Sequence, residues 1–321
     1  MAAEPLTTRR GPNPVRGEKV LVTGGAGFVG RTVVAALRAA GARVRVVDEL
    51  PAPDPEVESV VGDLREPAVL AAAVTADLTG IIHLAARTSV LQSVRDPAGV
   101  HEVNVELTAR LLEAARLAGV GRFMLASTNA VVGDIGSGRI HEDVPLRPLT
   151  PYGATKAACE MLMSGYAGSY GMTTCAVRLT NIYGPGMAHK DSFVPRLMRA
   201  ASADEGVEVY GDGEQRRDLV HVEDVARGFL AAWQAGHTGP VIVGAGRSVT
   251  VTELVEAARK ATGKPIPVRN IAAKPGEMPA VIVDISRARS LGYEPRVTLE
   301  EGLVGVWDDF RARVSGSAGA C

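Results

Sequence analysis

The chain has 321 residues, 46% of them hydrophobic, which is enough to bury a substantial core in one large domain or two unequal ones. A net charge of −1 excludes the basic field that favours nucleic acid, and no apolar run approaches the roughly 20 residues of a membrane span. Three scattered cysteines, at 159, 175 and 321, argue against a disulfide framework or a metal site and favour the cytoplasm. Residues 1–16 are expected to be a disordered leader and 315–321 a flexible tail.

The first predicted element is a short apolar strand over 20–22 that runs into TGGAGFVG at 23–30 and then into a helix over 28–40. Gly24 permits a tight turn, Gly27 lets the backbone approach a pyrophosphate, and Gly30 lets the helix pack close to the strand. The start of that helix also offers unpaired N–H groups to phosphates. An ordinary strand–turn–helix is the alternative, but the pattern favours a dinucleotide-binding loop.

The second predicted strand, residues 43–47, ends in Asp48, which lies 24 residues after Gly24. This is close to the spacing at which an acid takes the adenosine ribose hydroxyls. A carboxylate here would repel a 2′-phosphate, so the sequence favours NAD over NADP.

Strands and helices continue to alternate, with strands expected over 57–61, 81–84 and 122–126 and a long helix over 98–117. This alternation predicts an α/β fold with a parallel sheet covered by helices on both faces. His83 stands in an apolar run, so a buried core histidine is a better interpretation than a catalytic one.

A helix is predicted from Pro151 onward, and it places Tyr152 and Lys156 four residues apart on one face. Tyrosine is a poor base at neutral pH, and a nearby ammonium group favours the phenolate. The pair is therefore a candidate general base, although Tyr-x-x-x-Lys is common by chance.

Together with the glycine loop, this pair resembles the extended branch of the short-chain dehydrogenase/reductase superfamily. Within it, the chain looks nearest to UDP-glucose 4-epimerases among the nucleotide-sugar epimerases and dehydratases, over residues 18–312. The resemblance implies a Rossmann-type, doubly wound NAD-binding domain over 17–175. Residues 176–314 would form mainly a smaller C-terminal substrate-binding part, with chain crossing back. It also implies a homodimer, for which helices within 100–118 and 153–170 are candidates.

Further motifs carry this resemblance. STNAVVG at 127–133 is similar to the family's S-[ST]-x-x-V-Y-G, with Val132 in place of tyrosine. Residues 178–185, RLTNIYGP, and 211–218, GDGEQRRD, are similar to segments that hold the substrate's diphosphate, where a bidentate arginine suits phosphate. KPGE at 274–277 stands where the family has R-x-G-[DE], and lysine is a less specific phosphate ligand.

The resemblance implies a role for each matching residue. The implied catalytic residues are Thr128, Tyr152 and Lys156. The implied NAD-binding residues are Gly24, Gly27, Phe28, Val29, Asp48, Asp63, Leu64, Leu84, Ala85, Ala86, Asn104, Tyr152 and Lys156. The implied substrate-binding residues are Thr128, Asn129, Asn181, Val194, Tyr210, Arg217, Lys274 and Glu277, and no metal ligands are expected.

The implied activity is NAD-dependent C4 epimerisation of a UDP-hexose, either glucose/galactose or the corresponding uronates, through a 4-keto intermediate. The family's dehydratases carry Asp and Glu directly after the catalytic threonine, whereas this chain has Asn129 and Ala130. A dehydratase, a decarboxylase and a dehydrogenase remain alternatives, as does a non-catalytic NAD-binding regulator. His189, Lys190 and Arg196 could meet a uronate carboxylate, and Val281 stands where the family carries a size-selecting residue.

Overall fold

The computed structural model describes residues 15–272 and 280–318, with side chains up to Arg313. Lys274 and Glu277, most of the expected leader and the end of the expected tail therefore lie outside the described residues.

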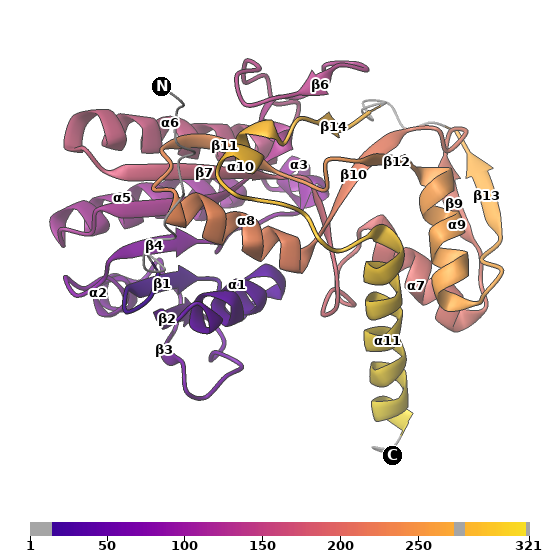
Figure 1. Ribbon diagram of the computed structural model, residues 1–321, viewed down its shortest axis with the longest axis horizontal. Coiled ribbons are helices and arrows are strands. Elements are labelled where there is room, and N and C mark those ends of the chain that lie inside the picture. The colour runs from indigo at the N-terminus through magenta and orange to yellow at the C-terminus, as the bar shows by residue number, and fades with distance from the viewer. Residues whose placement is uncertain (1–14, 273–279, 319–321) are drawn as a thin grey trace, which may run out of the picture.

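The larger part of the molecule is a seven-stranded parallel sheet with helices on both faces, as the sequence predicted (Figure 1). The strand order is β11-β7-β5-β4-β1-β2-β3, so the chain runs outward in both directions from β1. The strands are β1 (Lys19–Thr23), β2 (Arg43–Asp48), β3 (Glu58–Val61), β4 (Gly80–His83), β5 (Arg122–Thr128), β7 (Thr173–Leu179) and β11 (Gly239–Val243). The helices of this part are α1 (Phe28–Ala39), α2 (Pro67–Ala73), α3 (Val90–Arg95), α4 (Pro97–His101), α5 (Leu107–Leu117), α6 (Pro151–Tyr170) and α8 (Val222–Gln234).

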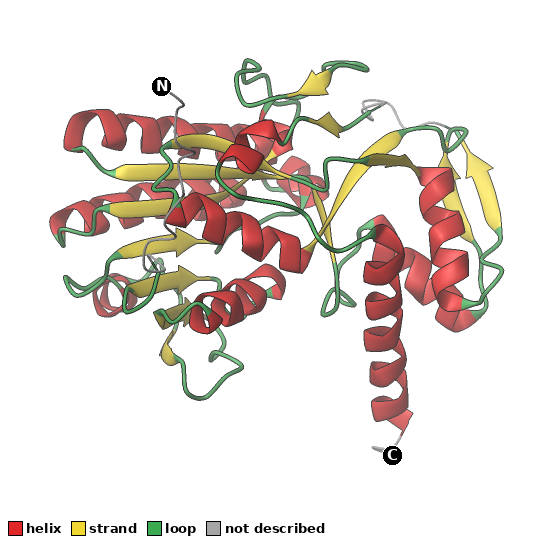
Figure 2. Ribbon diagram, viewed as in Figure 1, coloured by secondary structure: helices red, strands yellow, loops and turns green. Residues whose placement is uncertain are grey.

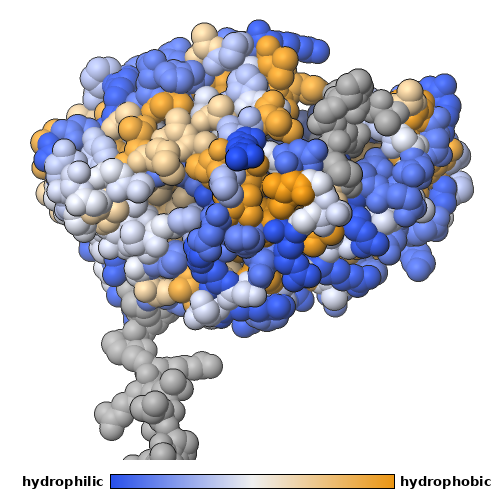
Figure 3. Space-filling view, turned by 90° about the horizontal axis from the view of Figure 1, so that it is seen from above, coloured by the Kyte–Doolittle hydropathy of each residue, from blue (hydrophilic) through white to orange (hydrophobic). Residues whose placement is uncertain are grey.

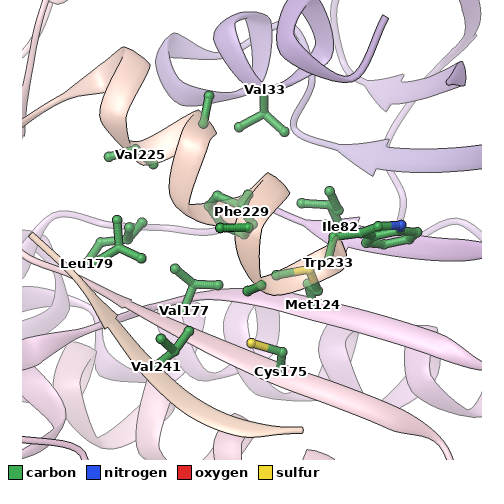
Figure 4. Close-up of a cluster of buried hydrophobic side chains, with 14 of the residues drawn as sticks. Val33, Ile82, Met124, Cys175, Val177, Leu179, Val225, Phe229, Trp233 and Val241 are labelled. Carbon is green, nitrogen blue, oxygen red and sulfur yellow. The ribbon is translucent and has the colours of Figure 1, made fainter. Parts of the chain in front are cut away.

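Successive residues of a strand point to opposite faces of the sheet, and the central strands are apolar on both. Leu21, Ile81 and Phe123 pack with α5 and α6 on one face. Their neighbours Ile82 and Met124 pack on the other face, where Phe229 and Trp233 of α8 cover them (Figure 4). The central strands therefore form a buried layer, and the residues that follow their carboxyl ends reach an open cavity.

The smaller part is built mainly from the C-terminal half and lies to one side of the sheet (Figure 2). Its core is formed by α7, α9 and α11 with the strands between them. Its elements are β8 (Asn181–Tyr183), α7 (Phe193–Ala203), β9 (Val207–Tyr210), β10 (Arg216–His221), β12 (Ser248–Thr250), α9 (Val251–Thr262), β13 (Val268–Ile271) and α11 (Leu299–Ala318). Two short strands, β6 (Arg139–Ile140) and β14 (Ile282–Val283), pair beside the sheet, followed by α10 (Ser286–Ser290).

The chain crosses between the two parts more than once. It leaves the sheet after β7, builds β8 to β10, and returns through α8 and β11 before completing the smaller part. The expected boundary at residue 175 lies inside β7, and β11 returns to pair with that strand.

The helix expected over 98–117 is interrupted. A π-helical turn, Glu102–Glu106, separates α4 from α5, and Asn104 lies in it. Such single π-helical turns inside an α-helix are rare and are frequent at functional sites.

The surface mixes polar and apolar side chains. On the face in Figure 3, hydrophobic patches are interrupted by hydrophilic side chains. Among the described residues, no helix has the length and apolar composition needed to cross a membrane.

Candidate functional site

A cavity of about 980 Å³ lies where the carboxyl ends of the parallel strands face the smaller part. Loops after β1, β2, β4 and β5, the start of α6, and residues of β9 and β10 line it. All predicted site residues within the described chain line it except Asn104: Gly24, Gly27, Phe28, Val29, Asp48, Asp63, Leu64, Leu84, Ala85, Ala86, Thr128, Asn129, Tyr152, Lys156, Asn181, Val194, Tyr210 and Arg217. The structure thus brings together residues that are up to 193 positions apart in the sequence.

The glycine loop after β1 has the geometry that a dinucleotide phosphate requires. Gly24 has a φ of +69°, and a Cβ there would lie 2.8 Å from the backbone nitrogen of Ala85. A Cβ on Gly30 would clash with the carbonyl oxygen of Gly24. Helix α1 begins after Gly27 with no side-chain cap and no acid in its first turn, so its N–H groups are left for an anion.

One carboxylate, Asp48, ends β2, and another, Asp63, follows the neighbouring strand β3. Asp48 accepts hydrogen bonds from the backbone nitrogens of Ala26 at 3.0 Å and Leu50 at 3.2 Å, which fixes it beside the glycine loop. Asp63 is bound by the Arg65 guanidinium, which holds the pKa of that carboxyl below its usual range. These acids, the small residues Ala85 and Ala86, and the glycine loop together fit an adenine dinucleotide.

Tyr152 and Lys156 lie one turn apart on the buried face of α6, which Thr150 caps and Pro151 begins. Burial raises the pKa of Tyr152 to about 12, and the neighbouring Thr128 hydroxyl, at the end of β5, lowers it only in part. Burial likewise lowers the pKa of the Lys156 ammonium. The expectation that Lys156 pulls the tyrosine pKa down is therefore wrong for the protein alone, because desolvation of the phenolate dominates.

His83 is buried, as predicted, and joins the glycine-loop strand to the helix layer. Its Nδ1 lies 2.7 Å from the Thr23 hydroxyl and its Nε2 3.1 Å from the Thr108 hydroxyl. Thr108 in turn donates to the carbonyl oxygen of Asn104 at 2.5 Å. Burial and the nearby Lys156 charge lower the pKa of His83 to about 3, so this ring is neutral.

Asn104 does not line the cavity, and its contacts make it a support for residues that do. Its side chain accepts from the backbone nitrogen of Arg87 at 2.9 Å and donates to the Arg87 carbonyl at 3.0 Å. It also donates to the Thr155 hydroxyl at 3.1 Å, between Tyr152 and Lys156. The π-helical turn thus presents one amide that holds the loop after β4 against the helix of the candidate base.

The substrate side of the cavity is lined by longer side chains. Arg217 of β10 lines it, and Asn181 donates to the carbonyl oxygen of Asp218 at 3.1 Å, which orients its amide. Lys190 also lines the cavity, and burial lowers its pKa, whereas His189 lies outside the lining. The side chain of Val281, the candidate size-selecting residue, is buried and faces the same space.

Several lining residues were not singled out from the sequence. Thr88 and Val90 follow the small residues after β4, and Ser192 and Phe193 begin α7. The first two could have been found, because residues just past a parallel strand meet at the sheet edge. The start of α7 could not, because only the packing of the smaller part places it there.

The carboxylates among the described lining residues are Asp48, Glu49, Asp63 and Glu208. The first three follow β2 and β3 on the glycine-loop side. Glu208 lies on β9 and pairs with Arg269. Next to Thr128, the lining residues are the uncharged Asn129 and Ala130.

The family model of the NAD dependent epimerase/dehydratase family matches residues 20–244. The chain belongs to this family. A UDP-glucose 4-epimerase of Mycolicibacterium smegmatis is 35% identical over 308 residues, covering 91% of this chain and 98% of the relative. A dTDP-glucose 4,6-dehydratase of Streptomyces niveus is 34% identical, covering 91% and 93%.

Among solved structures, MoeE5 in complex with UDP-glucuronic acid and NAD is 36% identical with a TM-score of 0.84, covering 92% of this chain and 99% of that one. The family is NAD-dependent, and the glycine loop, the Asp48 carboxylate and the free start of α1 fit NAD as the cofactor of this chain. The protein is therefore an enzyme of the NAD dependent epimerase/dehydratase family.

Proposed function

We propose that this enzyme is a C4 epimerase of a UDP-hexose. The observation that carries the proposal is the buried set of Thr128, Tyr152 and Lys156 in a cavity where the residues after Thr128 are Asn129 and Ala130. A bound NAD would accept a hydride from the sugar and return it. The glycine loop and Asp48 would hold it on the sheet side of the cavity.

Tyr152 would take the proton of the sugar 4-hydroxyl onto its phenolate oxygen. Burial opposes this charge, so the phenolate needs local stabilisation. Thr128 would supply a hydrogen bond to the same oxygen, and Lys156 is a buried cation on the same helix face. Because the proton returns from Tyr152 when the hydride returns, the residues end each cycle unchanged.

Dehydration and decarboxylation would need a further acid or base next to the sugar. An amide cannot donate a carboxylic proton to a leaving hydroxyl, and the methyl group of Ala130 cannot accept a proton. The other described lining carboxylates lie after β2 and β3 or on β9, paired with Arg269. The lining therefore favours reduction of the 4-keto sugar by the returning hydride over loss of water or CO2. The relatives include both epimerases and dehydratases.

Two substrate classes remain within the proposal. Arg217 and Asn181 suit the diphosphate common to all nucleotide sugars, because a guanidinium binds phosphate in a bidentate manner. Lys190 and Arg196 also line the cavity and suit a uronate carboxylate, so a UDP-uronate stands beside UDP-glucose and UDP-galactose.

We also propose a homodimer through α6. Its outer face carries Ala154, Ala158, Met161, Gly165 and Gly168 at alternating spacings of four and three, and the Met161 side chain is 58% exposed. Small residues at that spacing let two helices approach closely. Gly165→Glu should convert a dimer into a monomer in light scattering after size exclusion, and an unchanged mass would contradict this interface.

The reaction is tested by incubating the enzyme in D2O with UDP-glucose, UDP-galactose, UDP-glucuronate and dTDP-glucose, without added NAD. Epimerisation should interconvert a 4-epimer pair without deuterium on carbon, because the hydride never exchanges with solvent. Deuterium on a carbon atom of the product would indicate elimination or decarboxylation. A preference for dTDP-glucose would contradict the UDP-sugar assignment.

A further inference from the structure

A buried ion pair lies beneath the candidate catalytic residues. Glu160 of α6 and Arg178 of β7 have side chains only 4% and 3% exposed. The guanidinium donates to the carboxylate from Nη2 at 2.7 Å and from Nε at 3.1 Å. The Ser127 hydroxyl donates to the same carboxylate at 2.5 Å.

Ser127 and Glu160 belong to the elements that carry the candidate catalytic residues, and Arg178 lies on the neighbouring strand β7. Ser127 directly precedes Thr128 on β5, and its partner across the parallel ladder is Arg178. Tyr152, Lys156 and Glu160 follow one another at four-residue steps on the buried face of α6. One carboxylate is therefore bonded to both strands, about 12 Å along the helix from Tyr152.

Apart from a hydrogen bond from the Thr174 hydroxyl of β7 to the Met163 carbonyl oxygen at 3.1 Å, the remaining contacts of α6 with the sheet are mainly apolar. Cys159 and Met163 pack in an apolar cluster, and such contacts are non-directional. Moving the helix by one residue shifts a side chain about 1.5 Å along the axis and about 100° around it. The directional bonds at Glu160 cannot survive that change, because Arg178 is also held by the Glu142 carbonyl at 2.8 Å.

We propose that Glu160 and Arg178, with Ser127, are positioning residues that set the register of α6 over β5 and β7 and so hold Tyr152 in contact with Thr128. The expected change in kcat rests on the proposed epimerase function, whereas the expected shift of Tyr152 does not. Buried ion pairs add little net stability compared with apolar replacements, whereas removal of one partner is strongly destabilising. Both members must therefore be replaced together in a test.

The test variant combines Glu160→Leu with Arg178→Met, and its control combines Glu58→Leu with Arg45→Met at the far edge of the sheet, where that pair joins β2 to β3. We expect the test variant to fold and to bind its sugar nucleotide with an unchanged KM, while kcat falls about 10–100-fold because the base is misplaced. The control should keep wild-type kcat. Wild-type kcat in the test variant would overturn the proposal.

A crystal structure of the test variant gives a readout that needs no substrate. Tyr152 should be displaced from Thr128, whereas an unchanged contact would refute the proposal even if the epimerase assignment fails. If the double variant does not fold, Ser127→Ala leaves the ion pair intact and removes one link to β5. It should lower kcat in the same direction by a smaller factor, and wild-type kcat together with an unmoved Tyr152 would refute the proposal.

Discussion

The two parts of the molecule line the cavity with different kinds of groups. The sheet side contributes backbone and small residues at the strand ends, such as Gly24, Ala85 and Ala86, together with carboxylates such as Asp48. The smaller part contributes long side chains, such as Tyr210 and Arg217. A surface made of backbone has a shape fixed by the fold, whereas long side chains can be exchanged without moving a strand. The cofactor side is therefore the rigid partner in this cavity, and the substrate side is where related enzymes can differ.

The largest effect on turnover is expected at Tyr152, where the cofactor side and the substrate side of the cavity meet. Tyr152→Phe should retain the fold and NAD while kcat falls by about 10²–10⁴-fold, because the proton acceptor is removed and the ring still packs. Tyr166→Phe on the same helix is the matched control, since its hydroxyl bonds Glu113 away from the cavity. Near wild-type turnover in Tyr152→Phe would exclude it from the reaction.

A change on the substrate side should leave the cofactor side intact. Arg217→Gln should raise KM for the sugar nucleotide about 10–100-fold, the usual range for losing a charged hydrogen bond, and should leave the NAD content unchanged. Arg216→Gln, on the same strand but outside the cavity lining, is the control. Steady-state kinetics with dinucleotide assay of the denatured protein measure both, and loss of NAD from Arg217→Gln would show that the two sides are not separable.

The converse test changes a residue on the cofactor side and should leave the substrate side intact. Asp48→Asn should weaken NAD binding about 10-fold and improve binding of NADP, because the carboxylate no longer repels a 2′-phosphate. KM for the sugar, measured at saturating NAD, should stay constant. Glu56→Gln, whose side chain is 78% exposed and which does not line the cavity, should change neither. Calorimetric titration measures the affinity of the variant for NAD and for NADP. An unchanged ratio of the two affinities would show that Asp48 does not contact the ribose.

The last prediction concerns the stability of the sheet side and not catalysis. The pKa of His83 is lowered to about 3 by burial, against 6.5 as the ordinary value. Between these values the unfolded chain binds a proton that the folded chain does not, so stability should fall as the pH drops below 6.5, by about 1.4 kcal/mol per unit. Urea unfolding at several pH values should show a shallower dependence for His83→Gln than for wild type. His141→Gln, whose ring is half exposed, should keep the wild-type slope.

What could be predicted from the sequence depends on whether a feature is set by a local pattern or by contacts between distant segments. The glycine spacing, Asp48 and the Tyr152–Lys156 step are local patterns, and the structure places all of them in one cavity. The π-helical turn at Asn104 was not foreseen, and the partners of its side chain, Arg87 and Thr155, lie in segments distant in the sequence. The pKa of Tyr152 was mispredicted because sequence spacing reveals a neighbouring charge but not the depth of burial. The division into parts, the homodimer and the cytoplasmic location stay predictions.

Strand β11 shapes how the chain can fold as it leaves the ribosome. It pairs in parallel with β7, yet β8 to α8 lie between the two in the sequence. Until residue 243 has emerged, β7 is an unpaired edge, and Phe229 and Trp233 are not yet available to cover the apolar face beside it. A nascent chain that ends near Leu179 therefore exposes both a strand edge and a hydrophobic face, a combination prone to aggregation. Stalled or truncated chains of this length should depend on chaperones, and completion of the sheet should be a late event in synthesis.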